Sequence, residues 1–156
     1  MQAFKQDYTF LRCAKDKGRG GKKMKAVAAR MTRGLNLGAK VVAADNSGAR
    51  IVKVVGVKGG KVRRGRQQHV KIGDWVKVSV RKGLPEMKGK VFDAVVIRQK
   101  KPYRRNTGER IAFQDNAVAL LKDEKGNPKG TQIKGPVSRD VVDRWKEIGK
   151  IAQFIV

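Results

Sequence analysis

Residues 72–83 have the sequence IGDWVKVSVRKG, in which apolar and polar side chains alternate from Val76 to Arg81. Successive side chains of a β-strand point to opposite faces of the sheet, so this alternation predicts a strand with one buried face and one solvated face. Two β-branched runs, ARIVKVVGV at 49–57 and KVFDAVVIRQ at 90–99, predict two more strands.

Shorter apolar runs at 40–45, 110–114 and 116–122 predict three further strands. The predicted strands at 40–45 and 49–57 are joined by Asn46-Ser47-Gly48, in which Asn46 and Gly48 tolerate the positive φ that tight turns need. Short strands separated by turns, with few helical patterns, are typical of an antiparallel barrel or sandwich. Trp75 and Phe92 are expected in its core.

The last third of the chain changes character. The segment DEKGNPKG at 123–130 predicts the tip of a hairpin, and SRDVVDRWKEIGKIA at 138–152 predicts a helix that Ser138 caps. Val141, Trp145 and Ile148 would share one face of that helix, and Gly149 would end or interrupt it. Four basic and three acidic residues lie in 138–156, a balance that favours docking on protein over docking on phosphate.

Residues 1–33 differ from everything that follows. They hold 10 basic and 2 acidic residues without an apolar period. We interpret them as a basic N-terminal extension, either disordered until it meets a partner or the result of a start codon assigned upstream of the true one. The predicted organisation is therefore this extension, a β core at 34–122, and a hairpin with a helical segment at 123–156.

The charge balance points to a polyanionic partner. The 156 residues include 38 Lys and Arg against 13 Asp and Glu, a formal charge of +25, while 40% hydrophobic residues suffice for a small core. A single cysteine excludes an internal disulfide, and neither a secretory signal nor an apolar run long enough to span a membrane is present. These features predict a cytoplasmic protein without a membrane partner.

Catalytic patterns are weak. Asp140, Asp143 and Glu147 alternate with basic residues as on a solvated helix face, and His69 has no Cys or Ser nearby in sequence. Phosphate-binding glycine motifs are absent from the sequence. We therefore predict no enzyme activity, no cofactor and no metal site.

Three basic clusters carry the functional signal, and each falls in a connection between predicted strands. Long cations in loops on a rigid barrel can converge on a phosphate backbone, and a tyrosine among them could stack on a base. The predicted nucleic-acid-binding residues are Lys58, Lys61, Arg63, Arg64 and Arg66; Arg81, Lys82, Lys88 and Lys90; and Arg98, Lys100, Lys101, Tyr103, Arg104, Arg105 and Arg110.

RNA is favoured over DNA because the sequence contains no helix-turn-helix, zinc-finger or basic-zipper pattern. Arginine-rich loops with glycine hinges suit an irregularly folded RNA. A free-standing single-strand nucleic-acid chaperone with an oligonucleotide-binding-like barrel is the alternative, and it would need exposed aromatic side chains on a strand face.

The chain from about Thr32 to Val156 strongly resembles the universal large-subunit ribosomal protein L-fourteen family. The resemblance is most specific at 91–120, with its apolar run 94–97, Gly108, Arg110 and Asn116, and ADNSGA at 44–49 is a second match. The long basic loop and the tail are similar to the archaeal and eukaryotic branch.

The resemblance implies a five-stranded β-barrel with an extended hairpin and short C-terminal helices, bound to large-subunit ribosomal RNA. It also implies a place at the intersubunit face, with a bridge to small-subunit RNA, neighbours that include the third large-subunit protein, and a surface for an anti-association initiation factor. The loop cations become RNA contacts. Asn46, Gly48, Gly108 and Asn116 become structural residues, with Asn116 bridging backbone at a strand start.

Overall fold

The computed structural model describes residues 31–60, 62, 67–105 and 107–156. Most of the predicted N-terminal extension lies outside this range, as do Lys61, Arg63, Arg64 and Arg66 of the first basic cluster.

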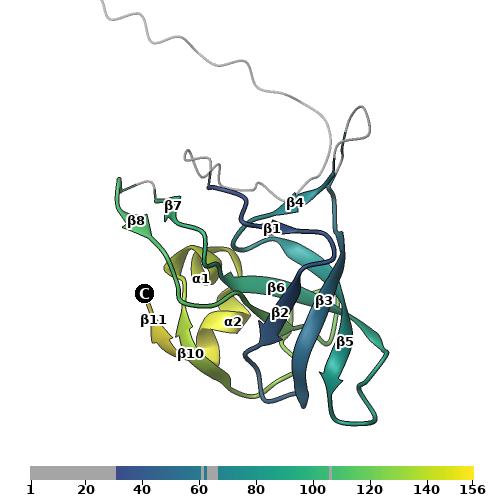
Figure 1. Cartoon of the computed structure of the whole chain (residues 1–156). Coiled ribbons are helices and arrows are strands. Elements are labelled where there is room, and N and C mark those ends of the chain that lie inside the picture. Colours follow the sequence, from purple (N-terminus) through teal and green to yellow (C-terminus); the bar gives the residue numbers. More distant parts are fainter. Residues whose placement is uncertain (1–30, 61, 63–66, 106) are drawn as a thin grey trace, which may run out of the picture.

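The centre of the molecule is a closed five-stranded barrel (Figure 1). Its strands, in order around the barrel, are β2 (Lys40–Ala43), β3 (Ala49–Val57), β5 (Trp75–Gly83), β6 (Val91–Arg98) and β9 (Ala117–Leu120). The predicted mainly β class and five-stranded barrel are confirmed.

One strand pair departs from the expected antiparallel barrel. Four of the five pairings are antiparallel, but β2 pairs with β9 in parallel, with Val42 opposite Ala117. The reason is topological: if each strand of a closed ring runs opposite to the one before it, the fifth strand runs in the same direction as the first. An odd-stranded barrel must therefore contain one parallel contact.

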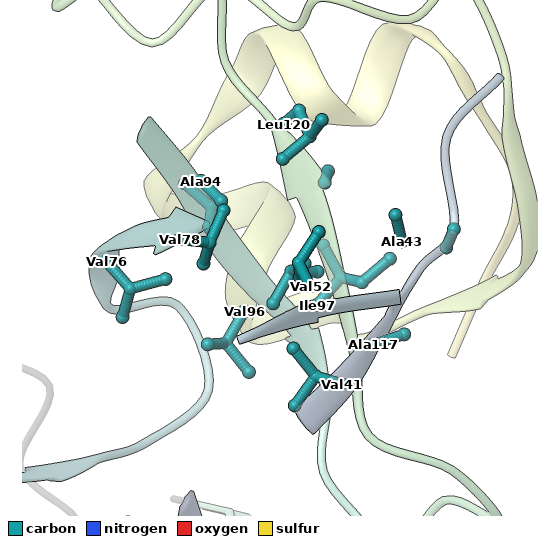
Figure 2. Packing of buried hydrophobic residues seen from close by; sticks show 14 of the residues in the cluster. Val41, Ala43, Val52, Val76, Val78, Ala94, Val96, Ile97, Ala117 and Leu120 are labelled. Atoms are coloured by element: carbon teal, nitrogen blue, oxygen red, sulfur yellow. The ribbon is translucent and has the colours of Figure 1, made fainter. Parts of the chain in front are cut away.

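Valines and small residues fill the barrel. Val52, Val54, Val76, Val78 and Ala94 are fully buried. Figure 2 shows Val52, Val76, Val78 and Ala94 gathered with side chains from β2 and β9. The alternation seen in the sequence is thus the alternation between the inside and the outside of the barrel. Trp75 and Phe92 are only partly buried and pack at the edge of this core, not within it.

Three two-stranded pairs surround the barrel. β1 (Leu35–Asn36) pairs with β4 (His69–Val70), β7 (Tyr103–Arg104) with β8 (Arg110–Ile111), and β10 (Ile133–Val137) with β11 (Ala152–Ile155), the last pair in parallel. The strand expected at 110–114 is therefore short and lies in a hairpin outside the barrel. We call residues 99–113 the hairpin.

The short C-terminal helices that the family resemblance implies are confirmed, whereas the continuous helix that the pattern at 138–152 predicts is wrong. The chain forms α1 (Arg139–Arg144) and α2 (Lys146–Lys150), separated at Trp145, which has φ −123° and ψ 78°. The Trp145 indole donates a hydrogen bond to the Gly73 carbonyl at 3.0 Å and meets the Trp75 ring edge-on at 5.5 Å. The helix breaks where this side chain reaches the barrel, and Gly149 lies inside α2.

Residues 133–156, which we call the C-terminal segment, contain β10, α1, α2 and β11 and cover one wall of the barrel (Figure 1). Ala94 through Arg98 of β6 are all buried, because one face of β6 lines the barrel and the other lies under this segment. The contact is direct: the Ser138 backbone N–H donates to the Ile97 carbonyl. Within the described residues, no helix is long and apolar enough to cross a membrane.

Asp45 is a buried carboxylate at the end of β2. It is 5% exposed, and one of its oxygens accepts a hydrogen bond from the Leu120 N–H at 3.3 Å. Burial raises the pKa of Asp45 above its ordinary value of 3.8, while the hydrogen bond from the Leu120 N–H lowers it by less.

Replacing Asp45 with asparagine should therefore raise the melting temperature at pH 7. A pKa that is higher in the folded state gives stability that is present below the unfolded pKa and is lost as pH rises through the folded pKa. The gain of Asp45→Asn over the wild type should shrink as the pH falls toward 4, measured by circular dichroism. A gain that grows toward acid pH would contradict this assignment.

Candidate nucleic-acid interface

The first basic cluster begins at the end of β3. Lys58 is exposed there, with its Nζ 3.6 Å from the centre of the Trp75 ring and 3.5 Å from a Glu124 carboxylate oxygen. The other four members, Lys61, Arg63, Arg64 and Arg66, lie outside the described residues. Lys58 thus marks the barrel end from which this loop leaves.

The turn between β5 and β6 lies at the opposite end of the barrel (Figure 1). In the second cluster, Arg81 and Lys82 are exposed on β5 itself, and Lys88 and Lys90 are exposed on this turn. That turn packs beside Gly48, whose carbonyl accepts the Leu84 N–H at 3.0 Å. Only two of these four cations are therefore in a loop.

The third cluster divides into exposed and interior residues. Lys100, Lys101, Arg104 and Arg110 are exposed along the hairpin. The hairpin stands at the same end of the barrel as β1 and β4 (Figure 1). These four side chains remain our predicted phosphate contacts on the hairpin.

Arg98 does not belong to this surface. It is 6% exposed and donates two hydrogen bonds to the Asp115 carboxylate, at 2.8 and 3.0 Å. It also donates to the carbonyls of Lys134 and Pro136, both at 2.9 Å. A guanidinium that makes these four bonds has a structural role, so we no longer propose Arg98 as an RNA contact.

Tyr103 is also interior. Its ring is 1% exposed, and its hydroxyl lies 2.7 Å from the Ser138 hydroxyl, so it cannot stack on a base as predicted. Burial raises the pKa of Tyr103 above its ordinary value of 10.0. Ser138 precedes α1 as expected of a cap, but its hydroxyl binds Tyr103 and Asp140 in place of a helix N–H.

Arg105 is largely buried. Its side chain is 12% exposed, its Nε donates to an Asp140 carboxylate oxygen at 3.1 Å, and its guanidinium also donates to the Val156 carbonyl. Asp140 is correspondingly only 17% exposed, so the view of this acid as part of a solvated helix face is wrong.

The residues predicted to be structural lie at turns and strand ends. The Asn46 side-chain oxygen accepts the Thr131 N–H at 2.8 Å, and Gly48 and Gly108 have φ of +96° and +97°. The Asn116 side-chain oxygen accepts the Lys100 N–H at 2.8 Å, immediately before β9. Asn116 therefore joins the hairpin base to the barrel.

The wall of the barrel carries cations that the loop argument missed. Lys40, Lys53 and Lys77 lie on β2, β3 and β5, with Lys40 paired opposite Lys53. Lys53 and Arg81 line an open depression beside Gly38 and Val55. The signal was present in the sequence, because Lys77 and Arg81 share the outward face of an alternating strand.

The exposed cations thus extend from the hairpin end, along the β2–β3–β5 wall, to the β5–β6 turn. The barrel core is rigid, so the spacing of the cations is fixed before a partner binds. Such a surface can neutralise phosphates over much of the length of the barrel. No group of three or more His, Cys, Asp or Glu side chains in the described part of the chain could hold a metal ion.

A family model and individual relatives point to the same protein family. Residues 34–156 match the family described as ribosomal protein L14p/L23e. The large ribosomal subunit protein uL14 of Nanoarchaeum equitans is 53% identical over 133 residues, which cover 85% of this chain and 100% of that protein. Its counterparts in Methanoregula boonei and Thermoplasma acidophilum are 50% and 47% identical with the same coverage.

Proposed function

The chain belongs to the ribosomal protein L14p/L23e family, and on that premise we propose that this structural constituent of the large ribosomal subunit binds ribosomal RNA through its lysine and arginine side chains. The residues proposed as contacts are Lys58, Lys61, Arg63, Arg64, Arg66, Arg81, Lys82, Lys88, Lys90, Lys100, Lys101, Arg104 and Arg110, joined by Lys40, Lys53 and Lys77 of the wall.

One observation supports this proposal above the others: the exposed cations stand on a rigid β scaffold whose buried members are almost all apolar. Each phosphate that a Lys or Arg neutralises releases condensed counterions, so binding weakens steeply with salt. Fixed spacing of the cations would select RNA by its shape and phosphate positions. The proposed role requires no catalytic step, which agrees with the structural role of the family.

Protein partners are proposed to dock on the C-terminal segment. Phe154 and Ile155 of β11 are 66% and 51% exposed, and β11 pairs on one edge with β10. An exposed apolar edge strand favours contact with another protein. We assign to this surface the expected neighbours, which include the third large-subunit protein and an anti-association factor, and we place the bridge to small-subunit RNA on the cationic surface.

The chaperone alternative is less favoured. It needs aromatic side chains open to bases on a barrel wall. Trp75 and Phe92 are partly buried, and lysine ammonium groups lie over their rings at 3.6 and 4.2 Å. In the described part of the barrel these two rings are thus poorly placed for stacking.

Sedimentation tests the proposal in the cell. The native protein should comigrate with large subunits on a sucrose gradient at low magnesium, in the cytoplasmic ribosome fraction, and should stay bound at roughly half-molar salt. Cross-linking of the same fraction should join Lys146 and Lys150 of α2 to neighbouring proteins. Protein that remains at the top of the gradient, or leaves at modest salt, would favour the chaperone.

A further inference from the structure

A single carboxylate joins the hairpin to the C-terminal segment. One oxygen of Asp140 lies 3.1 Å from the Tyr103 hydroxyl, 3.1 Å from the Ser138 hydroxyl and 3.1 Å from Arg105 Nε. Tyr103 and Arg105 come from the hairpin, whereas Ser138 and Asp140 come from the start of α1. We call these four residues the Asp140 network.

The network is closely packed and nearly dry. Tyr103 is 1% exposed and Ser138 is fully buried, while the Arg105 and Asp140 side chains are 12% and 17% exposed. Charge-assisted hydrogen bonds at such sites are stronger than bonds between neutral groups. Arg105 extends the network to the end of the chain, because its guanidinium also donates to the Val156 carbonyl.

The hairpin depends on contacts outside its own two strands. β7 and β8 are two residues each, and a hairpin this short is not stable by itself. Its base is held by the fully buried Gln99 and by the bond from the Lys100 N–H to Asn116. Beyond the base, Tyr103 and Arg105 are held by the Asp140 network.

We propose that Asp140 is a positioning residue for RNA binding: it holds the hairpin against α1, so that the hairpin cations are oriented before RNA arrives. This inference rests on the proposed function. Preorganisation saves the conformational entropy that a free hairpin would lose on binding.

The sign of the effect separates positioning from simple electrostatics. Asp140 is acidic, so replacing it with asparagine makes the protein more cationic, which by charge alone strengthens binding to RNA. A positioning role predicts the opposite, because a loosened hairpin binds less well. Asp143, on the same helix and exposed, provides the matched control.

The test uses the full chain and large subunits from which this protein has been removed by a salt wash. Asp140→Asn should bind these particles about tenfold more weakly than the wild type, whereas Asp143→Asn should bind as tightly or more tightly. Hydrogen exchange should be faster at 103–111 in Asp140→Asn and unchanged in β3 and β5. Equal binding by the two variants, or unchanged exchange in the hairpin, would overturn the inference.

Two further variants keep the outcomes distinct. Tyr103→Phe keeps the buried ring and removes only the hydroxyl, so it should weaken binding in the same direction by about threefold, even if Asp140→Asn does not fold. Lys100→Glu with Lys101→Glu tests the proposed function itself. If that pair weakens binding and neither network variant does, only the positioning role fails; if the pair has no effect, the proposed function fails.

Discussion

Replacing Arg98 with alanine should lower the free energy of unfolding by about 2–3 kcal/mol. The side chain is 6% exposed and is fixed by two bonds to Asp115 and by bonds to the Lys134 and Pro136 carbonyls. Its removal leaves the two backbone carbonyls without this donor and cuts one of the ties between the end of β6 and β10. The Asp115 side chain is 41% exposed, so water partly replaces its lost partner and the carbonyls account for most of the cost.

Urea unfolding followed by tryptophan fluorescence measures this loss, because Trp75 and Trp145 pack against each other at 5.5 Å and separate on unfolding. Lys100→Ala is the matched control. It removes a cation two residues away that is exposed, so it should change stability by no more than about 0.5 kcal/mol. Equal stability of the two variants would show that Arg98 is not structural and would restore it as a phosphate contact.

Reversing the charge of three exposed hairpin cations should weaken binding to large-subunit RNA by about a thousandfold at physiological salt. The substitutions are Lys100→Glu, Lys101→Glu and Arg110→Glu, none of which touches the Asp140 network. Loss of three phosphate contacts should also lower the slope of log affinity against log salt by about 2–3.

A salt series of RNA filter binding gives both quantities. The control is Lys125→Glu, Lys146→Glu and Lys150→Glu, which makes the same change in net charge on exposed residues of the C-terminal third. It should cost much less affinity, because these residues lie outside the proposed RNA surface. Equal losses in the two triple variants would mean that net charge alone drives binding, and the assigned surface would be wrong.

The barrel could be predicted because its information is local. The strand predicted at 49–57 has the same bounds as β3, and the alternation from Val76 to Arg81 became the inside and outside of β5. Side-chain periodicity of two is a property of the strand backbone and is visible in a short window of sequence. The parallel β2–β9 contact follows from closing a ring of five strands. It joins residues far apart in the chain, so no short window of sequence can show it.

The chain sequence by itself determined the five barrel strands, the turn at Asn46–Gly48, the excess of positive charge and the family. Only the tertiary structure decided which cations are exposed. Lys100 and Arg98 stand two residues apart in one basic run, yet Arg98 is fixed by carbonyls 36 and 38 residues further along the chain. The fold of the C-terminal segment over β6 buries Arg98 and Tyr103, because burial depends on contacts between residues that are distant in sequence.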